Sequence, residues 1–206
     1  MTREKQIILS AKVISLLFTP FYLPLLGMLL LFMFTYLSLL PWLYKTMVLT
    51  LVYLFTIPLP TILIHLYRRY QGWSPIQLSA RERRIIPYLI SILSYLCLAY
   101  IMHHMHMPHL MAAIVVAALL VQVACAIINV WWKISTHMAA IGGLVGALLV
   151  FSQIFIFNPI YPLCLILIVA GLLGSSRIIL RQHTLPQVVG GFLIGTLCTA
   201  VGVLFY

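Results

Sequence analysis

Long apolar runs separated by short polar segments are the feature that most constrains this chain. The runs cover residues 25–40, 46–66, 85–102, 110–131, 138–157, 160–175 and 188–205. A helix that crosses a bilayer needs about 20 apolar residues, and a helix satisfies its own backbone polar groups, as the lipid core requires. The pattern therefore predicts an all-α, polytopic membrane helical bundle with six to seven transmembrane helices.

Composition places the chain in the same class. Its 206 residues are 64% hydrophobic and 7% charged, whereas an ordinary soluble domain carries about 25% charged residues. No polar region is long enough to form a second, soluble domain. We therefore expect one integral membrane domain, in which the four cysteines of the apolar runs are packed thiols.

Prolines interrupt the first two predicted spans. Residues 1–12 are basic and polar, and Pro20 and Pro24 follow a short apolar stretch. This order predicts an interfacial or tilted helix that leads into a span starting near Thr19; the alternative is a short hairpin, which would move the amino terminus to the other side. Pro58 and Pro60 interrupt the second span, where neighbouring helices and side chains can satisfy the freed carbonyls.

Acidic residues are nearly absent. The chain has no Asp, and its only side-chain carboxylates are Glu4 and Glu82. This excludes chemistry by paired carboxylates and a carboxylate-built magnesium or calcium site. With twelve Lys and Arg and a net charge of +10, the expected partners are anionic, either membrane lipid headgroups or a phosphorylated substrate. Nucleic acid is not expected, because the basic residues form short clusters between spans.

Counting spans assigns the polar segments to two ends of the bundle. Residues 68–84, 133–137 and 177–187 are separated by even numbers of spans, so all three are predicted at one end. The opposite end should hold Lys45, the turn at 103–109, the turn at 158–159 and the carboxyl terminus. The polar residues that could take part in a reaction are therefore expected to lie together at one end.

Three clusters at the predicted shared end suit phosphate. In the first, Arg81 and Arg84 are three residues apart and would share a face if a helix begins here, and guanidiniums grip phosphate oxygens through paired hydrogen bonds. The second runs from Lys133 to His137, with Ser135 or Thr136 placed to cap the next helix.

The third cluster runs from Ser176 to Gln187. Arg177 stands six residues before His183 between two spans, and such a costly placement is a functional-site hypothesis by default. Thr184 or Leu185 would cap the following helix, with Pro186 as its first residue. His183 would then lie at a helix amino terminus, which favours an anion.

In this order, the clusters resemble the motifs of the type 2 phosphatidic acid phosphatase superfamily of membrane lipid phosphatases. Ser176, Arg177 and His183 match its third motif. Ser135 and His137 match its second, with Ile134 and Thr136 replacing Pro and Gly. Arg81, Arg84 and Pro87 match its first loosely. The resemblance covers roughly residues 80–200 and divides the chain into an N-terminal part, 1–79, with the interfacial segment and two spans, and a catalytic core, 80–206.

The resemblance implies hydrolysis of a lipid phosphate or polyprenyl pyrophosphate through a phosphohistidine. His183 would be the nucleophile, and His137 would act as acid and then base. Arg177, Arg84 and Arg81 would neutralise the transferring phosphoryl group, and Ser135 and Ser176 would belong to the same substrate-binding site. Neither a metal nor another cofactor is needed.

One position departs from the family pattern. The family has an Asp four residues after the nucleophilic His, and this chain has Gln187 there. An amide oxygen can accept the ring N–H, but it stabilises the imidazolium little. The comparable Asp to Asn change in a serine protease lowers kcat by about 10⁴-fold. Glu82 is the only nearby carboxylate that could take the place of the missing Asp. Because of Gln187, the rival hypothesis is a catalytically silent relative that binds or transports an anionic lipid.

Two further questions arise from the sequence. The His- and Met-rich segment 102–109 could ligate copper or zinc, but its spacing favours an interfacial turn. A metal transporter that uses this segment is the third hypothesis.

The sequence gives two opposed predictions for the membrane orientation. The positive-inside rule makes the catalytic end cytoplasmic, because every Lys and Arg but Lys45 falls there by parity, whereas the resemblance makes it periplasmic or lumenal.

Overall fold

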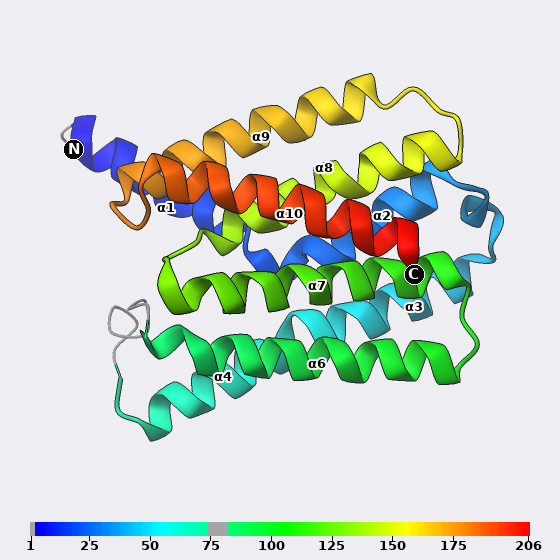
Figure 1. The fold of residues 1–206 in the computed structure, drawn as a ribbon, viewed down its shortest axis with the longest axis horizontal. Helices are drawn as coiled ribbons and strands as arrows, with labels where there is room; N and C mark the ends of the chain where they lie inside the picture. The colour runs from blue at the N-terminus through cyan, green and yellow to red at the C-terminus, as the bar shows by residue number, and fades with distance from the viewer. Residues whose placement is uncertain (1–2, 74–81) are drawn as a thin grey trace.

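The computed structural model describes residues 3–73 and 82–206, which form an elongated bundle of helices (Figure 1). Within these ranges every regular element is helical. The elements are α1 (Arg3–Leu17), η1 (Pro20–Tyr22), α2 (Leu23–Phe34), η2 (Tyr36–Leu39), α3 (Trp42–Thr56), α4 (Pro58–Tyr70), η3 (Glu82–Arg84), α6 (Ile85–His104), α7 (His109–Trp131), α8 (Thr136–Ile154), α9 (Ile160–Ile179) and α10 (Leu185–Phe205).

Seven helical segments of the described chain are long and apolar enough to cross a bilayer. Two of them join shorter helices, Arg3–Phe34 and Trp42–Tyr70, and the other five are α6 to α10. The predicted all-α bundle is confirmed, and the architecture is that of an integral membrane protein.

The first predicted segment is a separate helix followed by a break. α1 ends at Leu17, before the predicted span start near Thr19, and α1 packs against α9. The segment 177–187 is a loop only at 180–184: Arg177, expected in the loop, lies in the last turn of α9, and Gln187 lies in the first turn of α10. Ile178 and Ile179 extend the apolar pattern of α9 and carry Arg177 into the helix.

The polar segments gather at the ends that parity predicts (Figure 1). The amino terminus, the start of α6, the α7–α8 connection and the α9–α10 connection share one end, which we call the basic end. The α6–α7 and α8–α9 connections and the carboxyl terminus lie at the opposite end. Because α1 begins at the basic end and α2 approaches the opposite one, the hairpin alternative is not what forms.

Small residues bring α8 and α10 into backbone contact. A Cβ added at Gly195 would collide with the Ala139 carbonyl, and one at Gly146 with the Thr196 carbonyl. The Thr196 hydroxyl also donates to the Gly142 carbonyl across the seam at 3.0 Å. Close packing through small residues is a usual means of helix association in lipid. It fixes the starts of α8 and α10 beside each other.

A proline break divides the second span, and a side chain of α6 hydrogen-bonds a backbone carbonyl beside the break. The chain turns at Ile57, before Pro58. The Ser94 hydroxyl of α6 donates to the Phe55 carbonyl at 2.5 Å. This is the outcome expected for Pro58 and Pro60, since a neighbouring side chain satisfies a carbonyl beside the break.

The core does not divide at residue 80. The largest buried cluster combines Met28 and Val52 with Leu98, Met111 and Phe151, so both parts of the sequence contribute to it. All four cysteines are free thiols. The N-terminal helices therefore pack as an integral part of the bundle that holds the candidate site.

Candidate functional site

A sharp turn after α9 places His183 near Arg177. The Gln182 N–H donates to the Arg177 carbonyl at 3.1 Å and the Arg181 N–H to the Ile178 carbonyl at 2.9 Å, while Arg181 adopts a left-handed φ of 52°. These are the bonds of a Schellman C-cap. The chain thus folds back over the end of α9, and His183 is 6% exposed.

His183 is oriented by Gln187, one turn into α10. The Thr184 N–H donates to Gln187 Oε1 at 3.2 Å, and because a backbone N–H can only donate, the atom there is the amide oxygen. The same oxygen lies 3.1 Å from His183 Nδ1. Nδ1 therefore carries the hydrogen, which leaves the lone pair on Nε2. Thr184 is the N-cap residue and Pro186 the second helical residue, one position later than expected for Pro186.

Arg177 is buried beside this turn, with 6% of its surface exposed. Its Nη1 donates to the Ser15 hydroxyl of α1 at 2.6 Å. Its Nε is buried and has no hydrogen-bond partner among the described residues. A buried guanidinium N–H without an acceptor is costly, and an anion would relieve that cost.

The α7–α8 connection adds two more polar groups. The Ser135 N–H donates to the Gln187 carbonyl at 3.3 Å, which ties this connection to the first turn of α10. Ser135 is the N-cap residue of α8, as predicted, but its hydroxyl makes no capping bond. Within the described chain, Ser135 Oγ and His137 Nδ1 are both buried without a hydrogen-bond partner.

Positive charge surrounds His183. Burial, followed by the charges of Arg84 and Arg177, lowers the pKa of His183 to about 3, so the imidazole is neutral at pH 7. Burial also lowers the pKa of Arg84. The pKa of Lys133 is lowered by burial and by Arg84 and Arg177. His137 lies within electrostatic range of His183 and both arginines.

Glu4, the acidic side chain that the structure describes, does little to offset these charges. Glu4 is exposed in the first turn of α1, eleven residues before Ser15, or about 16 Å along a helix. The side chain of Glu82 and the whole of Arg81 lie outside the described residues. A phosphate group would supply the negative charge and the acceptors that this cluster favours.

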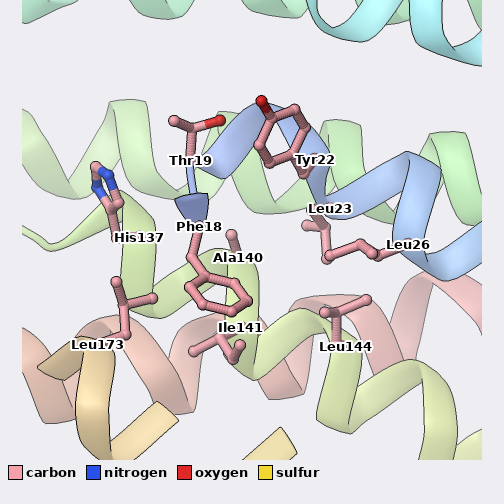
Figure 2. Close-up of a pocket in the computed structure, with 10 residues that line it drawn as sticks. All are labelled: Phe18, Thr19, Tyr22, Leu23, Leu26, His137, Ala140, Ile141, Leu144 and Leu173. Atoms are coloured by element: carbon pink, nitrogen blue, oxygen red, sulfur yellow. The ribbon is translucent and has the colours of Figure 1, made fainter. Parts of the chain in front are cut away.

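A narrow apolar pocket extends from His137 into the bundle (Figure 2). The cavity itself is small, about 10 Å³, and lies between the α1–α2 junction and the helices α8 and α9. One wall is a single face of α8, with His137, Ala140, Ile141 and Leu144 at helical spacing. His137 lies at one end of this wall and Leu144 at the other (Figure 2).

Six of the eight predicted site residues lie together at the basic end. Arg84, Ser135, His137, Arg177, His183 and Gln187 gather at the basic end. Arg81 lies outside the described residues. Ser176 is buried, and its hydroxyl donates its hydrogen to the Leu172 carbonyl of its own helix at 2.7 Å. The sequence prediction missed Ser15, whose only signal was a hydroxyl in an apolar stretch.

The His- and Met-rich turn lies at the opposite end, between α6 and α7 (Figure 1). His104 stacks on Tyr100, with 6.2 Å between ring centroids, and His109 packs against Tyr206 at 4.8 Å. In the part of the chain that the structure describes, no three His, Cys, Asp or Glu side chains are grouped to hold a metal ion. Two of the imidazoles thus contact aromatic rings.

Comparison of the chain with family models, with curated proteins and with solved structures finds no match. The class that the fold defines is an integral membrane helical bundle.

Proposed function

We propose that this protein is a membrane-embedded phosphatase that hydrolyses a lipid phosphate or pyrophosphate through a phosphohistidine on His183. The observation that carries the proposal is a buried, neutral imidazole with its Nε2 lone pair available, set among Arg84, Arg177 and Lys133. A nucleophile held neutral amid cations suits attack on an anionic phosphoryl group. The motif order that resembles the type 2 phosphatidic acid phosphatases supports the same chemistry.

Two displacements complete the reaction. His183 Nε2 attacks phosphorus, the P–O bond to the lipid breaks, and His137, which takes up a proton when the phosphate anion binds beside it, gives that proton to the leaving oxygen. Neutral His137 then takes a proton from water, whose oxygen attacks phosphorus. The P–N bond breaks, phosphate leaves and His183 is restored. Arg84, Arg177 and Ser135 donate hydrogen bonds to the phosphoryl oxygens throughout.

The pocket beside His137 supports a lipid as the substrate. Its lining beyond the imidazole is mostly apolar, and it lies between helices apolar enough to span a bilayer. The lipid would approach from the side, with its headgroup among Arg84, Arg177, His137 and His183. Because the cavity is only about 10 Å³, the α1–α2 junction would have to move away from α8 for an acyl chain to enter.

Phosphate release by purified protein tests this function. Wild-type protein in EDTA should release inorganic phosphate from phosphatidate, phosphatidylglycerophosphate or a polyprenyl pyrophosphate, and acid-labile, base-stable phosphate should be trapped on the chain. His183→Ala should abolish both signals, while Arg181→Ala should retain them, because Arg181 is exposed on the turn. No turnover by wild type, or equal turnover by His183→Ala, would sink the proposal.

Gln187 motivates a second candidate, a silent relative that binds or transports an anionic lipid. The amide accepts the His183 N–H but gives little stabilisation to a positively charged ring. Saturable binding of phosphatidate vesicles without any trapped phosphohistidine would favour this candidate over the phosphatase.

The proposed topology is multi-pass, with the basic end on the periplasmic or lumenal side. Single cysteines introduced at Gln71, the residue that follows α4, and at Asn158, in the α8–α9 connection, form a matched pair, because α4 ends toward the basic end and the α8–α9 connection lies at the opposite end (Figure 1). In intact cells an impermeant maleimide should label position 71 and spare position 158. The reverse pattern would assign the basic end to the cytoplasm, as the positive-inside rule predicts.

A further inference from the structure

The N-terminal helix α1 reaches the candidate site through one residue. Ser15 is 8% exposed, and α1 packs along α9, which carries Arg177. Ser15 Oγ accepts the Arg177 Nη1 hydrogen at 2.6 Å, a buried contact between residues 162 positions apart. The Ser15 backbone also approaches the His137 ring. One turn of α1 therefore contacts two of the groups assigned to phosphoryl transfer.

The bond to Ser15 restricts how Arg177 can turn. A guanidinium is planar, with five N–H donors in a fixed fork, so fixing Nη1 sets the direction of the others. Arg177 Nε lacks a partner within the described residues. Near a membrane surface, an Arg at a helix end ordinarily extends its head toward the headgroups. Ser15 opposes that extension and holds the unpaired N–H inside the bundle.

We propose that Ser15 is a positioning residue for Arg177, and that α1 thereby completes the phosphate-binding site. The inference rests on the proposed function for its substrate, but its first consequence is phosphate affinity, which can be measured without turnover. Ser15 is a neutral acceptor, so it orients the guanidinium without cancelling its charge. An Asp or Glu at this position would pair with Arg177 and compete with the phosphate.

The test compares three full-length variants with wild type in EDTA. Ser15→Ala removes the acceptor, Ser15→Thr retains a hydroxyl, and Ser10→Ala is the matched control, because Ser10 is exposed on the same helix and donates to its own Ile7 carbonyl at 2.9 Å. Binding of inorganic phosphate and of vanadate is measured by calorimetry. Turnover of phosphatidate is measured separately as kcat and KM.

Ser15→Ala should weaken phosphate and vanadate binding by about tenfold or more, as expected for loss of a hydrogen bond to a charged group, and should lower kcat. Ser15→Thr should recover most of the affinity, and Ser10→Ala should match wild type. Equal binding by wild type and Ser15→Ala would overturn the inference. If binding falls as expected while wild type releases no phosphate, the positioning role stands and the phosphatase fails. Wild type that binds neither anion would overturn both.

Discussion

The side-chain oxygen of Gln187 accepts two hydrogen bonds with different structural roles. Oε1 accepts the Thr184 N–H, which belongs to the start of α10, and the His183 N–H, which belongs to the site. The tautomer of the imidazole is thus set by the same contact that begins the helix. A carboxylate could accept both bonds and would also stabilise a positive charge on His183, which an amide does poorly.

Gln187→Glu should therefore increase turnover. Glu has the same length and shape as Gln, so it retains both hydrogen bonds, whereas the shorter Asp would have to reach farther. We expect kcat to rise by at least about tenfold, since the carboxylate stabilises the ring as P–N bond formation makes it positive. Gln187→Leu should lower kcat, because Nδ1 loses its acceptor. Phosphate release and phosphohistidine trapping measure both changes, and a slower Gln187→Glu would contradict the assigned role.

The pH dependence of stability should report the buried imidazole. The pKa of His183 is lowered to about 3 in the folded protein, against about 6.5 in an unfolded chain. The unfolded state therefore takes up the proton first as pH falls. The stability that neutral His183 contributes is complete above pH ~6.5 and is lost progressively toward pH ~3. The thermal midpoint in detergent should fall between pH 7 and 5, and His183→Gln should make that fall shallower.

Many of the candidate site residues were predictable one by one, because charged and imidazole side chains are rare between apolar runs. An Arg and a His between apolar runs are rare and costly, and that cost identified Arg177 and His183. Ser15 was not predictable, since one hydroxyl in an apolar stretch can bond its own helix, as Ser176 does with Leu172. Only the packing of α1 on α9 gives Ser15 its partner.

Among the elements, the proline break between α3 and α4 depends on α6. Ser94→Ala would leave the Phe55 carbonyl without its donor. We expect it to lower the free energy of unfolding by about 1–3 kcal/mol, the usual cost of a buried polar group left unpaired. Ser91→Ala is the matched control, because the Ser91 hydroxyl bonds the Pro87 carbonyl of its own helix. Equal unfolding midpoints for the two variants would contradict this role.

The contact between α8 and α10 can be tested by adding one methyl group. Gly195→Ala would drive a Cβ into the Ala139 carbonyl, which is backbone and cannot rotate away. We expect a loss of stability of about 1–3 kcal/mol from overpacking. Gly171→Ala adds the same group where no atom lies within 4 Å, and it should be neutral or slightly stabilising. Thermal unfolding of both variants in detergent gives the comparison.

Apolar runs located the helices but not all of their ends. The runs predict where a helix crosses lipid, yet α9 continues to Ile179, beyond the predicted end at residue 175. A tertiary contact accompanies this extension: α1 packs against α9, and Ser15 accepts a hydrogen bond from Arg177 in the last turn. Such long-range partners are invisible to a local pattern.

For the molecule as a whole, the two polar ends should be functionally separate. Replacing His103, His104 and His106 together with Asn should leave phosphate release unchanged, because these exposed residues lie at the end opposite His183. His183→Ala in the same assay is the contrast. If the triple replacement abolishes function and His183→Ala does not, the metal-transporter hypothesis replaces the phosphatase.

The close contact between α8 and α10 through glycines has an electrostatic consequence for the bundle. Because α8 and α10 both begin at the basic end and touch along their length, their dipoles are parallel and repel each other, unlike those of antiparallel neighbours. Each amino terminus carries roughly half a positive charge. A phosphoryl group held between the two starts would offset both at once. Binding of such a ligand would thereby be coupled to helix association, so α8 and α10 should be harder to separate when the site is occupied than when it is empty.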